Sequence, residues 1–234
     1  MKITGLQKMT LLDFPGKVAC TVFLGGCNFR CPFCHNSQML DGNAEQFMEE
    51  EEFFAFLKKR QGLLDGVCVT GGEPTLYPQL PDFLKRIRDM GFQVKLDTNG
   101  SRPQVLKALV EAGLVDYVAM DIKNSPAQYA ATVGVDWTPA ATEESIRFLM
   151  EDRVDYELRT TLVESLHNAE TVEAMGRWLG TLVPGKKPKQ LFLQSFVDRD
   201  TVRFSGLTAP EKDTVLHYAD TLSQYIGKVA VRGT

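Results

Sequence analysis

The chain has few of the residues that mark specialised classes of protein. Its 234 residues include only three histidines, two tryptophans and five cysteines, and no run reaches the about 18 apolar residues of a membrane span. Neither sign of charge dominates, since 26 basic and 30 acidic residues give a net charge of −4. A dedicated nucleic-acid binder is usually basic, so this balance argues against one. The content of 44% hydrophobic and 24% charged residues excludes disordered and collagen-like chains.

The N-terminal segment and the cysteines indicate a compartment. Residues 1–13 contain no long apolar stretch of the kind that a secretory signal peptide needs. The cysteines are odd in number, and three of the five fall within eight residues. This usage fits a reducing environment better than a framework of disulfides. We therefore expect a cytoplasmic protein with neither membrane nor nucleic-acid partners.

Short apolar runs alternate with amphipathic stretches along the whole chain. The expected strands span 18–24, 66–70, 92–97, 115–122, 155–163, 190–196 and, as a last short strand, 228–231. The expected helices span 47–60, 77–90, 103–112, 143–151, 169–182 and 210–225, with an extra turn near 127–131. Strands separated by helices predict repeated βαβ units, a parallel sheet and an α/β fold class.

Six strand–helix units fit either an open doubly wound sheet or an incomplete barrel. Polar residues stand at the carboxyl end of nearly every expected strand. Such a pattern favours one site ringed by strands, as in a partial TIM-like barrel, over a site at a single switch point. No linker divides the chain, so we expect one domain over 1–234, with a core of about 17–200 and a C-terminal helix and tail at 201–234.

The cysteine cluster is the most informative segment of the sequence. Cys27, Cys31 and Cys34 follow two glycines in a C-x3-C-x2-C spacing. Thiolates are soft ligands that select zinc or iron–sulfur clusters. Because a four-iron cluster is normally held by four cysteines, three ligands would leave one iron open to a further ligand.

Two other interpretations of the cysteines stay open at this point. A zinc site with three cysteines and one histidine is the main rival, and its fourth ligand would be His35, His167 or His217. Three structural thiols with this spacing are the simpler alternative. The remaining cysteines, Cys20 and Cys68, lie inside expected strands, and we expect them to pack as small core residues.

The cysteine spacing resembles that of the radical S-adenosylmethionine (SAM) superfamily. The aromatic Phe33 precedes the third cysteine, and the sequence Gly-Gly-Glu-Pro at 71–74 follows the second strand, as in that family. Further segments resemble one branch, the activating proteins of glycyl radical enzymes: 13–16 (DFPG), 34–36 (CHN), 96–100 (LDTNG), 120–123 (MDIK) and 133–135 (VGV). The resemblance covers about residues 5–200. It is closest to the group that activates anaerobic ribonucleoside-triphosphate reductase.

The resemblance implies a fold, two cofactors and a set of binding residues. The fold is a partial (βα)6 TIM-like barrel, and the three clustered cysteines hold a 4Fe–4S cluster whose open iron binds SAM. The GGEP backbone pairs with the SAM ammonium, and no side chain need act as a catalytic acid or base. The residues placed near SAM are Phe33, His35, Gly71, Gly72, Glu73, Asp97, Asn99, Asp121, Lys123, Arg159 and Gln194. For His35 we expect the backbone, more than the ring, to contact adenine.

Charge and position support several of these assignments. Asp97 ends an apolar strand, so burial would require a cationic partner: the SAM ammonium, Lys123 or a bound monovalent cation. Asp121 and Lys123 lie two residues apart and therefore share one face of a strand. Arg159 is a natural fork for a carboxylate. The simpler alternatives are a strand-end ion pair for the charged residues and, for Gly71-Gly72, a turn followed by a surface glutamate.

The sequence departs from the family pattern after the sixth strand. Related enzymes often carry a histidine there, beside the SAM ribose, whereas this chain has Gln194. Gln194 could hydrogen-bond the ribose in its place. His167 and His217 have no motif around them, and we expect ordinary surface or loop positions for both.

The resemblance also implies an activity and partners. Reductive cleavage of SAM would yield a 5′-deoxyadenosyl radical, which takes a hydrogen atom from a glycine of a partner enzyme. Residues 37–47 contain no cysteine, which favours the compact activating enzymes of anaerobic ribonucleotide reductase or pyruvate formate-lyase. A flavodoxin- or ferredoxin-like protein would supply the electron. The alternatives are a radical SAM enzyme acting on a small molecule, similar to carboxy-deazaguanine synthase, and a zinc-stabilised binding module.

Overall fold

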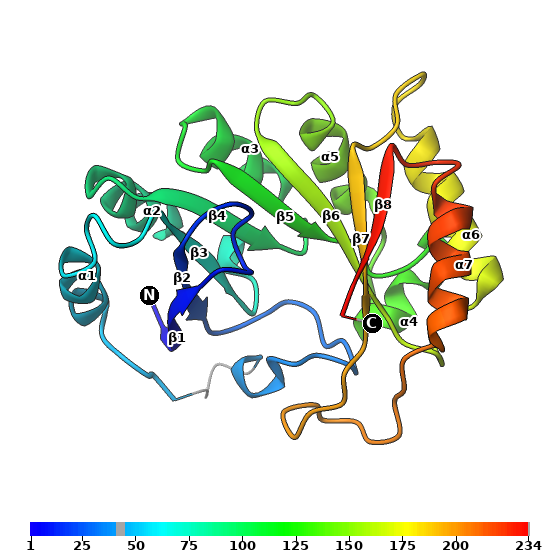
Figure 1. The fold of residues 1–234 in the computed structure, drawn as a ribbon, viewed down its shortest axis with the longest axis horizontal. Coiled ribbons are helices and arrows are strands. Elements are labelled where there is room, and N and C mark those ends of the chain that lie inside the picture. Colours follow the sequence, from blue (N-terminus) through cyan, green and yellow to red (C-terminus); the bar gives the residue numbers. More distant parts are fainter. Residues whose placement is uncertain (41–44, 234) are drawn as a thin grey trace.

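The computed structural model describes residues 1–40 and 45–233. In this part of the chain, one curved sheet of eight strands runs from β1 to β8 in chain order (Figure 1). β1 is antiparallel to β2, and each later strand is parallel to its neighbour. The strands are β1 (Ile3–Thr10), β2 (Ala19–Leu24), β3 (Gly66–Gly71), β4 (Gln93–Thr98), β5 (Tyr117–Asp121), β6 (Asp155–Leu162), β7 (Gln190–Ser195) and β8 (Lys228–Arg232).

Helices between the strands surround the outer side of this sheet (Figure 1). They are α1 (Glu50–Lys58), α2 (Leu80–Asp89), α3 (Pro103–Glu111), α4 (Tyr129–Val133), α5 (Ala140–Leu149), α6 (Ala169–Thr181) and α7 (Lys212–Leu222). On α2, Leu80, Phe83, Leu84 and Ile87 recur at helical spacing and are all buried in the core under the sheet. The predicted alternation of strands and helices, and with it the α/β class and the parallel sheet, is therefore confirmed.

The central strands have an apolar face and a polar face. On β4, Val94 and Leu96 are fully buried in the core that the helices cover. Lys95 and Asp97 alternate with them and therefore point to the inner, concave side of the sheet. An amphipathic strand of this kind places charged groups inside the partial barrel, where they can only be retained by pairing with one another.

β1 was not expected from the sequence. Its residues do not alternate cleanly between apolar and polar, and only Ile3 and Thr10 at its two ends are buried. It is an edge strand, held by pairing with β2 and by a backbone hydrogen bond from Phe47 to Ile3. At the other edge, β8 confirms the expected short strand at 228–231, so the segment 201–234 contributes a strand to the sheet as well as a helix.

The barrel is incomplete. β1 and β8 stand at opposite ends of the strand order and do not pair with each other in the described residues. Within residues 1–40 and 45–233, no helix combines the length and apolar content that a membrane span requires.

Candidate active site

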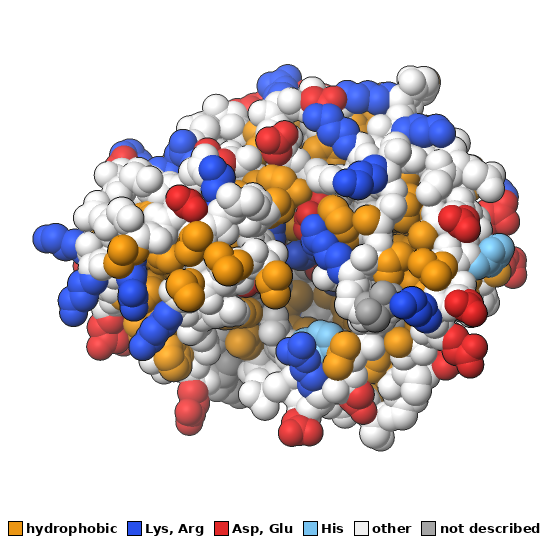
Figure 2. All heavy atoms as spheres, in the orientation of Figure 1, with side chains coloured by type: hydrophobic (Ala, Val, Ile, Leu, Met, Phe, Trp, Pro, Cys, Tyr) orange, Lys and Arg blue, Asp and Glu red, His pale blue; other side chains and the backbone are white. Residues whose placement is uncertain are grey.

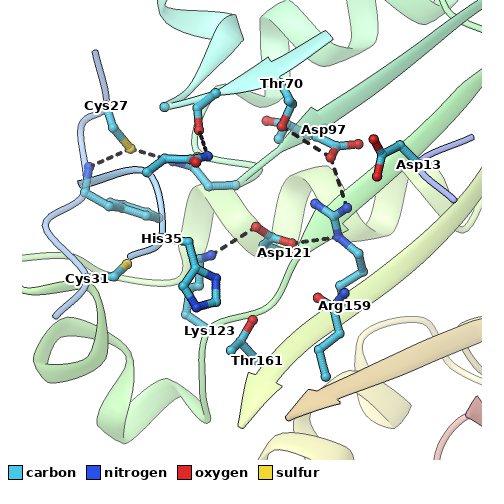
Figure 3. Close-up of a pocket in the computed structure, with 17 residues that line it drawn as sticks. Asp13, Cys27, Cys31, His35, Thr70, Asp97, Asp121, Lys123, Arg159 and Thr161 are labelled. Atoms are coloured by element: carbon cyan, nitrogen blue, oxygen red, sulfur yellow. Dashed lines mark hydrogen bonds and ion pairs between the residues drawn. The ribbon is translucent and has the colours of Figure 1, made fainter. Parts of the chain in front are cut away.

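A cavity of about 370 Å³ lies at the carboxyl ends of the parallel strands (Figure 3). The loop after β2 and the ends of β3 to β7 supply its walls. The lining residues are Asp13, Cys27, Phe29, Cys31, His35, Asn36, Thr70, Gly71, Gly72, Asp97, Thr98, Asn99, Asp121, Lys123, Arg159, Thr161 and Gln194. Most residues that the sequence places near the cofactors thus meet at one cavity, whereas Phe33, Cys34 and Glu73 lie outside its lining.

The cysteine loop forms one end of the cavity, where Cys27 and Cys31 border it (Figure 3). All three clustered cysteines are free thiols of intermediate exposure. The Cys27 sulfur accepts a hydrogen bond from the backbone N–H of Phe29 at 3.3 Å, and the N–H of Cys34 donates to the carbonyl of Cys31 at 3.2 Å. These local bonds fold the loop into a compact turn that holds three sulfur ligands within one short segment.

The thiols need a cationic partner to ionise. Burial raises the pKa of Cys27 to about 12 and that of Cys31 to about 11, and it also raises the pKa of Cys34. The Lys123 ammonium lowers all three pKa values but does not offset burial. A bound metal deprotonates a coordinating thiol outright, and a soft donor set of three sulfurs fits an iron–sulfur cluster. Among the described residues, no group of three His, Cys, Asp or Glu side chains is arranged to hold a single metal ion, so the geometry adds no support for zinc.

The two glycines after β3 pack directly on the cysteine loop. Gly71 has a φ of +126°, and a Cβ at Gly72 would lie 2.0 Å from the carbonyl oxygen of Gly26. The backbone N–H groups of Gly72 and Glu73 donate to the carbonyls of Leu24 and Gly26, each at 2.8 Å. Any side chain here would push the two loops apart, so close backbone approach requires glycine. The exposed backbone at 71–72 therefore lines the cavity beside the cysteines.

The side chain of Glu73 lies outside the cavity lining and supports the loops beside it. Its side chain is fully buried. It accepts hydrogen bonds from the backbone N–H groups of Asn99 (2.7 Å) and Thr75 (3.1 Å) and from the hydroxyls of Thr98 (2.8 Å) and Thr75. Burial raises the pKa of Glu73, and these hydrogen bonds oppose the rise. Glu73 thus ties the loop after β3 to the loop after β4, and the surface-glutamate alternative is wrong.

Asn99 connects that loop to the cysteine segment. Its Nδ2 donates to Oδ1 of Asn28 at 3.0 Å and lies 3.9 Å from the sulfur of Cys27. Its Oδ1 accepts from the backbone N–H of Ser101 at 2.9 Å, which fixes the orientation of the amide. The predicted cofactor residue Asn99 is therefore held beside the first cysteine of the loop.

Five charged side chains form a chain of ion pairs across the inner face of β4, β5 and β6. Arg159 lies in the middle, with Nη1 3.0 Å from Oδ2 of Asp97 and Nε 2.9 Å from Oδ1 of Asp121 (Figure 3). At the two ends, Lys95 Nζ lies 2.8 Å from Oδ1 of Asp97, and Lys123 Nζ lies 3.0 Å from Oδ2 of Asp121. The Lys95 contact is an ion pair without hydrogen-bond alignment, which leaves Oδ1 of Asp97 with no aligned donor.

These pairs explain the acidity of the two carboxyls. Burial raises the pKa of Asp121, but Arg159 and Lys123 outweigh it and lower the value to about 2. In the same way, Arg159 and Lys95 outweigh burial and lower the pKa of Asp97. The predicted Asp121–Lys123 pair is confirmed, although Lys123 lies just beyond the end of β5. Among the partners suggested for Asp97, Lys123 is wrong, because it pairs with Asp121 instead.

The loop after β7 closes the side of the cavity at His35. The ring of His35 stacks on Phe196, with ring centroids 5.5 Å apart and planes at 8°, and its Nε2 lies 2.7 Å from the carbonyl oxygen of Val197. Phe33 is buried against Phe196. The side chain of Phe33 therefore supports this wall from behind. Gln194, at the end of β7, faces the cavity in the position where the family often has a histidine.

His167 lies in a loop, one of the two positions that the sequence suggested, but it is not on the surface. It is 2% exposed, and its Nε2 lies 2.9 Å from the carbonyl oxygen of Lys123, while Nδ1 contacts the backbone of Val163. Burial lowers the pKa of its imidazole. From the loop after β6, the His167 ring thus holds the backbone of Lys123 in place. No motif surrounds His167, so the sequence carried no signal for this role.

Sequence reasoning missed residues of the cavity wall and one buried charged residue that pairs with the wall residue Asp97. Lys95 is the most consequential, and its signal was available, because it stands two residues before Asp97 and so shares its face. Asp13 accepts a hydrogen bond from the Thr21 hydroxyl at 2.6 Å, and Asn36 donates to the carbonyl of Gly71 at 2.9 Å. Both belong to segments recognised only as family motifs.

Comparison with known proteins gives several findings. A family model described as the radical SAM superfamily matches residues 21–177. A protein of Methanocaldococcus jannaschii, named "Putative glycyl-radical enzyme activating enzyme MJ1227", is 28% identical over an alignment of 240 residues that covers 98% of this chain and 95% of that protein. The 7-carboxy-7-deazaguanine synthase of Koribacter versatilis is 33% identical over 140 residues, which is 58% of each chain.

A solved structure extends the likeness to the fold. A domain of the pyruvate-formate lyase-activating enzyme from Bacteroides vulgatus superposes with a TM-score of 0.58 at 22% identity, covering 72% of this chain and 99% of that one. At this identity the match supports the architecture of the partial barrel and says nothing of the substrate.

Proposed function

The chain belongs to the radical SAM superfamily, and from this premise we propose that it activates a glycyl radical enzyme by removing a hydrogen atom from a glycine of that partner. Support comes from the Methanocaldococcus relative, whose name states this role and whose match spans nearly the whole of both chains. The finer assignment, also proposed, is that the partner is an anaerobic ribonucleoside-triphosphate reductase. It rests on the sequence motifs and on the lack of cysteine in residues 37–47.

As a radical SAM enzyme, the protein uses a 4Fe–4S cluster and SAM. Cys27, Cys31 and Cys34 would hold the cluster, because they are free thiols of one short loop and two of them border the cavity. When bound and reduced, the cluster supplies the electron that splits SAM into methionine and a 5′-deoxyadenosyl radical. The backbone of Gly71 and Gly72 would accept the SAM ammonium.

The protein's own residues would orient the cofactor and keep the site ordered. Arg159 donates one hydrogen bond from Nε to Asp121 and one from Nη1 to Asp97. Its remaining N–H groups can bind a carboxylate in the cavity. Asn99 stands beside the first cysteine. Gln194 and the stacked His35 would border the nucleoside. None of these groups needs to gain or lose a proton, since the reaction transfers an electron and a hydrogen atom.

The observation that favours a protein substrate is a group of exposed hydrophobic side chains near the cavity. Eight large hydrophobic residues are exposed in the described part of the chain, and three stand next to residues of the site: Leu12 precedes Asp13, Val197 contacts His35, and Phe204 lines a neighbouring pocket with Cys31. Leu12, the residue before the cavity residue Asp13, is 90% exposed. Hydrophobic side chains gather around a hollow near the middle of the face in Figure 2. Such a surface is typical of protein interaction sites and is unnecessary for a small molecule.

An anaerobic activation assay tests the proposal. Reduced, cluster-loaded protein is mixed with SAM and, separately, with the anaerobic ribonucleotide reductase and the pyruvate formate-lyase of the same organism. We expect an EPR doublet from a glycyl radical in the reductase mixture, with 5′-deoxyadenosine as coproduct. A doublet with the lyase alone would transfer the assignment to that partner.

The second candidate function is a radical SAM reaction on a small molecule. The likeness to a carboxy-deazaguanine synthase over 58% of the chain favours it. If SAM is cleaved but no candidate glycyl radical enzyme gives a radical, the activase proposal is wrong and this alternative gains.

A further inference from the structure

Five charged side chains inside the barrel form one continuous series of ion pairs, which we call the electrostatic unit: Lys95, Asp97, Arg159, Asp121 and Lys123. Their side chains are mostly buried, from 3% exposure for Lys95 to 30% for Asp121. Both carboxylates are shared: Asp97 lies between Lys95 and Arg159, and Asp121 lies between Arg159 and Lys123. Arg159 is the link that joins the two halves, because it contacts both.

Each of the four carboxylate oxygens has its own cationic nitrogen. Oδ1 of Asp97 faces Lys95 at 2.8 Å and Oδ2 faces Arg159 at 3.0 Å. Oδ1 of Asp121 faces Arg159 at 2.9 Å and Oδ2 faces Lys123 at 3.0 Å. No carboxylate oxygen of this pair is therefore left without a positive neighbour.

The charge count of the unit is positive. Three cations and two carboxylates give 3 − 2 = +1. A metal cation that entered between Asp97 and Asp121 would join the three cations already paired there and would raise the charge of the unit from +1 to +2. Repulsion between like charges is strong at these distances in a low-dielectric interior. An anion, by contrast, brings the unit to neutrality.

A bound monovalent cation was one suggested partner for Asp97, and the arrangement does not fit it. We propose that the Arg159 guanidinium is the built-in counterion of Asp97 and Asp121, so that the cavity takes the carboxylate of SAM without any monovalent metal. Arginine suits this position because its planar fork reaches two carboxylates at once and stays charged at every working pH. Lys95 strengthens the arrangement by occupying the remaining oxygen of Asp97. The inference does not depend on which substrate the enzyme attacks.

Equilibrium dialysis of SAM against the cluster-loaded protein tests the proposal. The dissociation constant is measured in sodium, potassium and tetramethylammonium chloride at one ionic strength, so that screening is equal. For the natural protein we expect values within about twofold of each other, since only a specific cation site would distinguish the salts.

Variants of Arg159 make the test sharper. In Arg159→Met we expect SAM binding in tetramethylammonium chloride to weaken by about 10- to 100-fold, the range expected from losing charged hydrogen bonds. Sodium or potassium should restore part of this loss by entering between the two carboxylates. Arg159→Lys keeps the charge and should remain insensitive to the salt. Arg153→Met is the matched control, because Arg153 pairs with Glu111 and Glu151 on the surface.

A second readout uses no cofactor. The thermal midpoint of cluster-free Arg159→Met should rise with sodium or potassium but not with tetramethylammonium, whereas the natural protein and Arg153→Met should respond equally to all three salts. If Arg159→Met does not fold, the insensitivity of the natural protein and of Arg159→Lys carries the test. A saturable gain in SAM affinity of the natural protein with sodium or potassium would overturn the proposal. Loss in Arg159→Met that no cation restores would overturn the role of Arg159 as counterion.

Discussion

The five cysteines fall into two groups that differ in their surroundings, although burial raises the pKa of every one of them. Cys20 and Cys68 are fully buried within strands, whereas Cys27, Cys31 and Cys34 lie in a loop and are partly exposed. Burial nevertheless raises the pKa to about 12 for Cys20, Cys27 and Cys68 alike. A raised pKa alone therefore does not distinguish a packing thiol from a ligand.

What separates the groups is their access to a partner. The loop thiols lie at a polar cavity and within the field of Lys123, while Cys20 belongs to the main core and Cys68 packs on Phe14 and Ala19. A ligand needs room for a metal and a route to it, and only the loop provides both. Exposure and neighbouring groups, and not the pKa, therefore distinguish the proposed ligands from the packing thiols.

The largest expected effect is on SAM cleavage. Cys31→Ala should abolish it, because a cluster held by two thiolates would be incomplete, whereas Cys68→Ala should leave it nearly unchanged. The measurement is 5′-deoxyadenosine formed by reduced, reconstituted protein in the absence of a partner. Equal loss in both variants would contradict the division of the five thiols into two groups.

A smaller effect is expected in chemical reactivity. In cluster-free, folded protein, iodoacetamide should modify Cys27, Cys31 and Cys34 well before Cys20 and Cys68, which have no exposed surface. The rate at Cys31 should increase with pH up to about 11, its pKa, because the thiolate is the nucleophile. Peptide mass spectrometry at timed intervals gives the order. If the strand cysteines react as fast as the loop cysteines, access does not separate the groups.

The carboxylates of the same cavity differ from the thiols, because their cationic partners are already in place. The pKa of Asp121 is lowered from 3.8 to about 2, so its ionised form stabilises the fold. This contribution is complete above a pH of about 4, the value for an unfolded aspartate, and is lost as the pH falls through about 2.

Urea unfolding between pH 2 and 6 measures this effect. Asp121→Asn should reduce the free energy of unfolding at pH 6 and flatten its fall toward pH 2. The matched control, Asp155→Asn, removes an exposed carboxylate at the start of β6 and should leave the profile of the natural protein unchanged. An Asp121→Asn profile as steep as that of the natural protein would show that Asp121 has no part in the acid sensitivity.

Most of the fold could be predicted because the parallel strands are buried on the helix side. Val67 and Val69 in β3, and Val94 and Leu96 in β4, give strong apolar signals that the helix-forming segments separate. β1 gave no such signal, because most residues of this edge strand are partly or fully exposed and need not be apolar. Its pairing with β2 is a tertiary contact, which the local sequence pattern does not predict.

The site was predictable where a motif fixes the chemistry, and less so where packing does. The cysteine spacing identified the loop, but the sequence could not show that Glu73 turns inward to hold Thr75, Thr98 and Asn99. His167 acts through a contact with a distant segment, because its ring reaches the carbonyl of Lys123. Such contacts depend on how strands lie beside one another, which spacing along the chain does not contain.

The interlocking of the cysteine loop with later segments sets the timing of maturation. The N–H of Glu73 donates to Gly26, and the N–H of Arg30 donates to the carbonyl of Val133 at 2.7 Å. During synthesis, the ligand loop therefore emerges long before the chain that shapes it, and it reaches its final form only after residue 133 has left the ribosome. We therefore expect the loop to hold its cluster in the final geometry only after at least 133 of the 234 residues have been made.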